Sequence, residues 1–145
     1  CTYEVDQVIL AIVVTTGIAS IFLTKDYTPD YNSGLAHAIF YALTSYPVIE
    51  KNHLHGEVVG FGVLLALLVD GQDEEFEKIY QLNKSILLPI SLDEIEISKE
   101  QWEESTDRIP DMSDVAHYPY KVTKEMLKNA MARLEEKVRK DNHVR

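Results

Sequence analysis

The sequence is short of cysteine, of positive charge and of segments that alternate between apolar and polar residues. Its single cysteine, Cys1, cannot form an internal disulfide, so we expect a protein of the reducing cytoplasm. The chain has 14 lysines and arginines against 24 aspartates and glutamates, a net charge of −10. Nucleic acid and membranes are therefore not expected partners, because binding to nucleic acid or to an anionic membrane surface needs a basic face. The lack of period-two alternation argues against strands, and the predicted fold class is all-α.

Residues 8–23 form an apolar segment without any charged side chain. The segment is shorter than the roughly 20 residues that usually span a membrane. It follows Glu4 and Asp6 rather than the basic flank of a signal peptide. We therefore predict a buried central helix, with a membrane span as the less favoured alternative.

Helical periodicity and capping residues divide the rest of the chain. Helices are predicted over about 34–44, 56–69 and 74–84, with a last helix after Thr123. Ser33 and Thr123 are the expected N-caps, and Ser98 with Gln101 has the spacing of a capping box. The segment 86–90 contains Pro89 and is predicted to be an extended connector. Three glycines in the 56–69 helix lower its propensity and therefore predict a close backbone approach to a neighbouring helix or a ligand: Gly56, Gly60 and Gly62.

Two histidines, His37 and His55, are the candidate metal ligands. His37 stands in Ala36-His37-Ala38-Ile39, at the start of one predicted helix, and His55 stands 18 residues later in His55-Gly56-Glu57. Neutral imidazole is the commonest protein ligand for zinc, and two imidazoles from adjacent helices can converge on one ion. Two histidines alone are weak evidence for a metal site, since a packing or capping role is more common.

The sequence around these two histidines is similar to the C-terminal part of the iron-containing alcohol dehydrogenase and glycerol dehydrogenase superfamily. The resemblance rests on Ala36-His37-Ala38-Ile39, on the stretch from His55 to Gly62, and on Leu88-Pro89-Ile90-Ser91-Leu92. It covers roughly residues 8–95, and the glycerol dehydrogenase branch is the best match. The resemblance implies the C-terminal half of a dehydroquinate-synthase-like dehydrogenase, a multi-helix fold in which His37 and His55 bind the metal. It implies no catalytic residues beyond these ligands.

The chain also departs from that family pattern. No glycine-rich phosphate-binding turn is present, so we expect residues 1–145 to be a single helical metal- and substrate-binding domain that lacks the N-terminal nucleotide-binding domain. Neither Asp6, Asp26 nor Asp30 has the context of the family's metal-binding aspartate. Phe40-Tyr41 stands where many relatives carry another histidine. Zinc is therefore favoured over iron, with NAD bound mainly by the absent domain and no cofactor-binding residue assigned here.

The resemblance implies an NAD-dependent polyol or alcohol dehydrogenase, with glycerol oxidised to dihydroxyacetone as the preferred reaction. We expect a homo-oligomer whose isolated 145-residue fragment is inactive. Phosphorylated substrates are less favoured, because no lysine or arginine lies between Lys25 and Lys51. The alternative is a non-catalytic helical interaction domain, which has no reason to depend on metal.

Several other residues have two readings. His53 is expected to be exposed, with adventitious metal binding as the alternative, and His117 is expected in a surface turn. Glu57 either orients His55 or stabilises a helix N-terminus. The residues 31–33 either form a turn, which is favoured, or line a substrate pocket.

Overall fold

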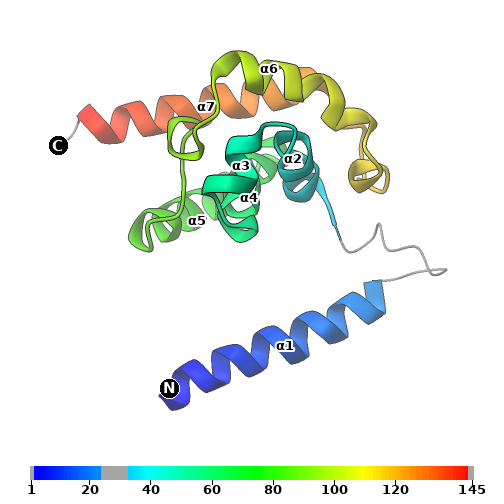
Figure 1. Ribbon diagram of the computed structural model, residues 1–145, viewed down its shortest axis with the longest axis vertical. Helices are drawn as coiled ribbons and strands as arrows, with labels where there is room; N and C mark the ends of the chain where they lie inside the picture. Colours follow the sequence, from blue (N-terminus) through cyan, green and yellow to red (C-terminus); the bar gives the residue numbers. More distant parts are fainter. Residues whose placement is uncertain (1, 24–32, 144–145) are drawn as a thin grey trace.

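A computed structural model describes residues 2–23 and 33–143, and these residues are helical and contain no strand (Figure 1). The predicted all-α fold class is therefore confirmed for the described chain. Within these described residues, seven α-helices and three short 3-10 helices follow one another: α1 (Tyr3–Leu23), α2 (Leu35–Leu43), α3 (Pro47–Asn52), α4 (His55–Val69), α5 (Asp73–Ser85), η2 (Asp93–Ile95), α6 (Lys99–Arg108), η3 (Ile109–Asp111), η4 (Ser113–Val115) and α7 (Lys124–His143).

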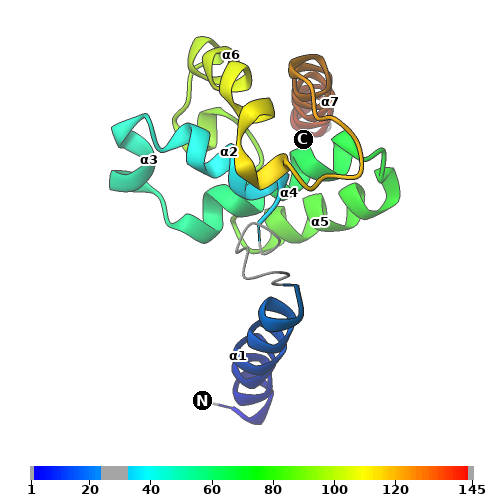
Figure 2. The ribbon, with the colours of Figure 1, turned by 90° about the vertical axis from the view of Figure 1, so that its right-hand side faces the viewer.

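Helix α4 is the centre of the bundle formed by residues 33–143. It packs against α2, α5 and α7, while α6 contacts α2 and α7 (Figure 2). Phe61, Leu64 and Leu65 of α4 are fully buried, as expected for a helix that is apolar on every side. The amphipathic α7 buries Leu127, Ala130, Met131 and Leu134 against this core.

Gly62 lets α2 and α4 approach each other closely. A Cβ atom built on Gly62 would lie 2.7 Å from the carbonyl oxygen of Ala36 and 3.0 Å from its Cα. The predicted close approach is therefore confirmed at Gly62, and the neighbour is a helix backbone. It does not extend to Gly56, whose Cβ would meet nothing within 4 Å. Gly60 would make only an ordinary contact, at 3.5 Å from Leu88 Cδ1.

The capping predictions hold at two helices and fail at one. The Ser98 hydroxyl accepts from the Gln101 N–H, and the Gln101 side chain accepts from the Ser98 N–H, which forms the expected capping box of α6. The Thr123 hydroxyl accepts from the Met126 N–H at the start of α7. Ser33 does not cap α2, because the N-cap is Gly34 and no side chain caps that end.

Helix α3 is an element that the sequence analysis missed. Helix α2 ends at Leu43, and Pro47 then occupies the first turn of α3. Proline is favoured there because a first-turn N–H has no partner within the helix and the φ angle of proline is already helical. The helix buries Ile49 and places His53 immediately after its last turn.

The apolar segment is helical but is not a buried helix of the described chain. Helix α1 begins at Tyr3, earlier than the apolar segment, and its residues through Phe22 are exposed apart from the half-buried Ser20. Figures 1 and 2 both show α1 apart from the bundle. Residues 3–22 are long and apolar enough to cross a membrane, a test that a core helix or a signal sequence also passes. The expected burial is therefore wrong within this chain.

Candidate metal centre

His37 lies in the first turn of α2, as predicted, and its side chain is half-buried. Its backbone N–H and that of Ala38 both donate to the Gly34 carbonyl, at 2.9 and 3.0 Å, which fixes the start of the helix. Leu35, Ala38 and Ile39 face the core and are almost fully buried. The opposite face of this turn, with His37, is therefore left at the edge of the bundle.

His55 is the first residue of α4 and lies beside His37. The two ring centroids are 5.6 Å apart. Two imidazoles that bind one zinc ion, with Zn–N bonds of about 2.1 Å and a near-tetrahedral angle, have centroids about 5 Å apart. The pair is thus close to the spacing that one ion needs, and the residue His55 remains exposed to an incoming ligand. The close α2–α4 packing at Gly62 holds the two histidines together.

The surroundings of His37 favour its neutral form. Burial lowers the pKa of His37 below 6.5, the nearby His55 lowers it further, and Asp114 opposes both effects. A neutral imidazole has a free nitrogen lone pair, which metal binding requires. Asp114 belongs to η4 and was not singled out in the sequence, because it lies far from His37 along the chain.

The described residues supply no complete metal site. They contain no group of three or more histidine, cysteine, aspartate or glutamate side chains that could hold an ion. Of the aspartates weighed in the sequence, Asp6 lies in the exposed α1, and Asp26 and Asp30 fall outside the described residues. A zinc ion at His37 and His55 would therefore need further ligands from water, substrate or another part of the protein.

Aromatic rings hold the His55 side chain in place. Phe40 packs edge to face on the His55 ring, with centroids 4.4 Å apart and an interplanar angle of 76°. Tyr41 lies near His37, with centroids 6.3 Å apart. Sequence reasoning noted these residues only as a departure from the family pattern. Their spacing of three and four residues after His37 places all three on one side of α2, a signal that could have revealed the cluster.

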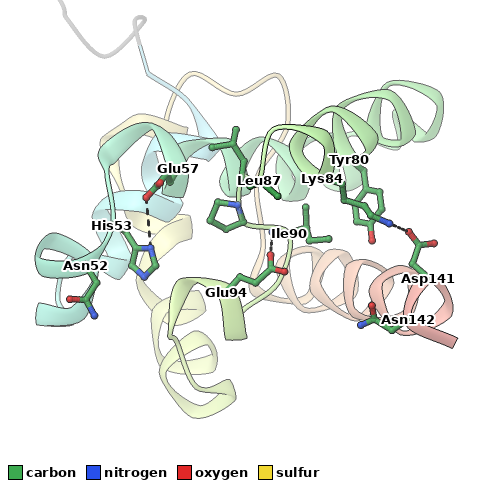
Figure 3. A pocket seen from close by; sticks show the side chains of 12 residues that line it. Asn52, His53, Glu57, Tyr80, Lys84, Leu87, Ile90, Glu94, Asp141 and Asn142 are labelled. Carbon is green, nitrogen blue, oxygen red and sulfur yellow. Dashed lines mark hydrogen bonds and ion pairs between the residues drawn. The ribbon is translucent and has the colours of Figure 1, made fainter. Parts of the chain in front are cut away.

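His53 does not behave as expected. Its side chain is only 10% exposed, and its Nδ1 lies 3.9 Å from a Glu57 oxygen (Figure 3). Its Nε2 lies 3.2 Å from a Glu96 oxygen. The prediction of an exposed His53 is wrong, because α3 and the segment around Glu96 enclose the ring. Glu57 accepts a hydrogen bond from the Leu54 N–H at 2.8 Å. It thus stabilises the N-terminus of α4, the second of its two predicted roles.

The remaining candidates stay at the periphery. His117 is exposed in a turn after η4, as expected. Tyr31 and Asn32 lie outside the described residues, so neither the favoured turn nor the alternative, a substrate pocket, is tested for them. Ser33 is half-buried and precedes α2.

Comparison with known proteins supports the fold. No protein-family model matches the chain, and no curated protein matches it. A solved structure, a probable glycerol dehydrogenase from Sinorhizobium meliloti 1021, aligns with a TM-score of 0.59 at 24% identity. The alignment covers 73% of this chain and 31% of that one, so the present chain spans less than a third of the matched protein. The aligned residues therefore share the fold of part of that protein, in agreement with the expected all-α, multi-helix fold.

Proposed function

We propose that this chain is the metal- and substrate-binding part of an NAD-dependent polyol dehydrogenase. The observation that carries the proposal is the placement of His37 and His55, from two tightly packed helices, with ring centroids 5.6 Å apart. The glycerol dehydrogenase likeness of the fold supports it. Packing alone would not require the His37 and His55 imidazoles to lie side by side, because His55 is exposed.

In this proposal, the residues of this chain bind the metal ion and orient the two histidine rings. His37 and His55 would bind the ion through neutral imidazole nitrogens, and Phe40 restricts the rotation of the His55 ring. When bound, a divalent ion supplies Lewis-acid chemistry that lowers the pKa of a substrate hydroxyl. Zinc is favoured over iron, because only two protein ligands are found among the described residues and Phe40-Tyr41 replaces the further histidine of many relatives.

The rest of the proposed reaction would belong to a nucleotide-binding domain. That domain would bind NAD and accept the hydride from the carbinol carbon. It would also cover part of the exposed apolar surface of α1, which otherwise favours self-association. We propose glycerol as substrate and dihydroxyacetone as product, in a cytoplasmic homo-oligomer, and no activity of the isolated chain.

A zinc titration followed by the imidazole NMR signals tests the metal centre. His37 and His55 should respond together at substoichiometric zinc, and His37→Ala should abolish the response of His55. His117→Ala is the matched control, because His117 is exposed and lies in a turn outside the pair. A response confined to His53, His117 or His143, or no response from any histidine, would contradict the metal centre and favour the non-catalytic interaction domain.

The enzymatic part of the proposal needs the complete protein. His37→Ala in a protein that includes the nucleotide-binding domain should lose most glycerol-dependent NAD reduction, while His117→Ala should retain it. Equal activity of the two variants would show that the pair has no part in the reaction, whatever zinc does to the isolated chain.

A further inference from the structure

Tyr41 lies beside His37, and its hydroxyl group is accessible to a ligand. The two residues are one helical turn apart on α2, so their side chains share one face of that helix. Their ring centroids are 6.3 Å apart, and Tyr41 is 45% exposed. Tyr46 and Tyr120 donate their hydroxyl hydrogens to partners within residues 33–143, whereas the Tyr41 hydroxyl makes no hydrogen bond there.

The pair of His37 and His55 leaves a coordination position that the commonest ligand types do not fill. No histidine, cysteine, aspartate or glutamate of the described chain joins the pair to form a group of three. Asp114 acts on His37 electrostatically but does not complete such a group. Catalytic zinc sites usually have three protein ligands and one open position. A third ligand from residues 33–143 must therefore be a residue of another type.

The distance between the Tyr41 and His37 rings fits two ligands of one ion. An imidazole and a phenolate that bind one zinc ion, with bonds of about 2.1 Å and a near-tetrahedral angle, have centroids about 6 Å apart. The observed separation is 6.3 Å. The 5.6 Å between the His37 and His55 rings is likewise close to the value for two imidazoles on one ion. His37 therefore has one neighbour at each of the two ligand spacings.

From this geometry we propose that Tyr41 is a third ligand of the metal centre, bound through its phenolate oxygen. This inference rests on the proposed function, because it needs an ion at His37 and His55. On binding, the Oη–H bond breaks, the proton passes to the solvent, and an electron pair of the oxygen forms the bond to the ion. The positive charge of the ion favours this ionised form, and zinc accepts oxygen ligands. One position then remains for the substrate hydroxyl.

Aromatic packing is the alternative role of Tyr41. Its ring packs against Phe40 with centroids 5.3 Å apart and an interplanar angle of 60°. That contact needs the ring and not the hydroxyl. Tyr41→Phe keeps the ring and removes only the oxygen, and it therefore separates a ligand from a packing residue. Because Tyr41 is exposed, we expect this variant to fold as the unmodified chain does, which circular dichroism checks.

A zinc titration of the 145-residue chain at constant neutral pH tests the proposal, with the near-ultraviolet absorbance of tyrosinate and the imidazole NMR signals recorded together. We expect one tyrosinate per bound zinc ion, formed in step with the response of His37 and His55. Tyr41→Phe should abolish the tyrosinate signal. In competition with a chelator it should weaken zinc binding by at least about tenfold, since even a residue that only orients a ligand contributes about 10–100-fold. Tyr3→Phe, which removes the same oxygen from an exposed position of α1, should change neither measurement.

The possible failures of this inference and of the proposed function are distinguishable. If His37 and His55 respond to zinc but no tyrosinate forms, or if Tyr41→Phe binds zinc as tightly as the unmodified chain, Tyr41 is not a ligand and the histidine pair stands. A tyrosinate signal that survives Tyr41→Phe would also overturn the assignment to Tyr41. No response from either histidine would overturn both the proposed metal centre and its third ligand.

Discussion

Replacement of Gly62 by alanine tests how the two helices of the candidate metal centre are held together. The new Cβ would lie 2.7 Å from the Ala36 carbonyl oxygen and 3.0 Å from the Ala36 Cα. Both atoms belong to the backbone, so no side-chain rotation can relieve the contact, and α2 must move away from α4. Ala36 directly precedes His37, and the movement would therefore also separate the two histidines.

The expected magnitude follows from two opposing effects. Overpacking a close helix contact costs about 1–3 kcal/mol, and the upper end applies here because backbone atoms clash. Alanine in place of glycine in a helix returns about 1 kcal/mol. The free energy of unfolding should thus fall by about 2 kcal/mol, which lowers the melting temperature by roughly 8 °C for a domain of this size.

Gly60→Ala on the same helix is the matched control. Its Cβ would make an ordinary contact, 3.5 Å from a Leu88 methyl, so it should gain helix propensity and be slightly stabilised. Urea denaturation monitored by circular dichroism compares the three chains. If Gly62→Ala is as stable as Gly60→Ala, the close approach of α2 and α4 does not exist in solution, and the argument for the histidine pair loses its structural basis.

Three further predictions concern the metal centre, the helix caps and acid stability. Phe40→Leu should weaken zinc binding about threefold to tenfold, because an aromatic pair contributes about 0.5–1.5 kcal/mol beyond area burial, and competition with a zinc chelator measures the change; an unchanged affinity would show that Phe40 does not orient His55. Ser98→Ala removes half of the α6 capping box and should lower the free energy of unfolding by about 1 kcal/mol in urea denaturation, whereas no change would assign the cap to Gln101 alone. The hydrogen bond from Lys84 lowers the pKa of Asp141 below 3.8. The stabilisation by this carboxylate is therefore present above the unfolded-state pKa and is lost as the pH falls through the lower folded-state pKa. Asp141→Asn should accordingly destabilise the chain at pH 7 and less at pH 3, and an equal loss at both would contradict the pairing.

The sequence by itself determined most of the local structure of this protein. The helices α2 and α5 follow from apolar periodicity, and α4 follows from a long apolar segment. The caps at Ser98 and Thr123 follow from hydrogen bonds between residues three apart. His37 and His55 could also be singled out from the sequence, because each lies in a short continuous motif that resembles a known family. Local interactions of this kind leave their pattern in the order of the chain.

Only the tertiary structure shows which residues and helices distant in the sequence lie side by side. Lys84 and Asp141 are 57 residues apart in sequence, and nothing local shows that they pair. His53 was expected to be exposed, because its burial depends on α3, a helix that begins at Pro47 and that the sequence analysis did not predict. The exposure of α1 could not be predicted from the sequence either. A uniformly apolar helix is expected to be buried, but its sequence does not show which surface buries it.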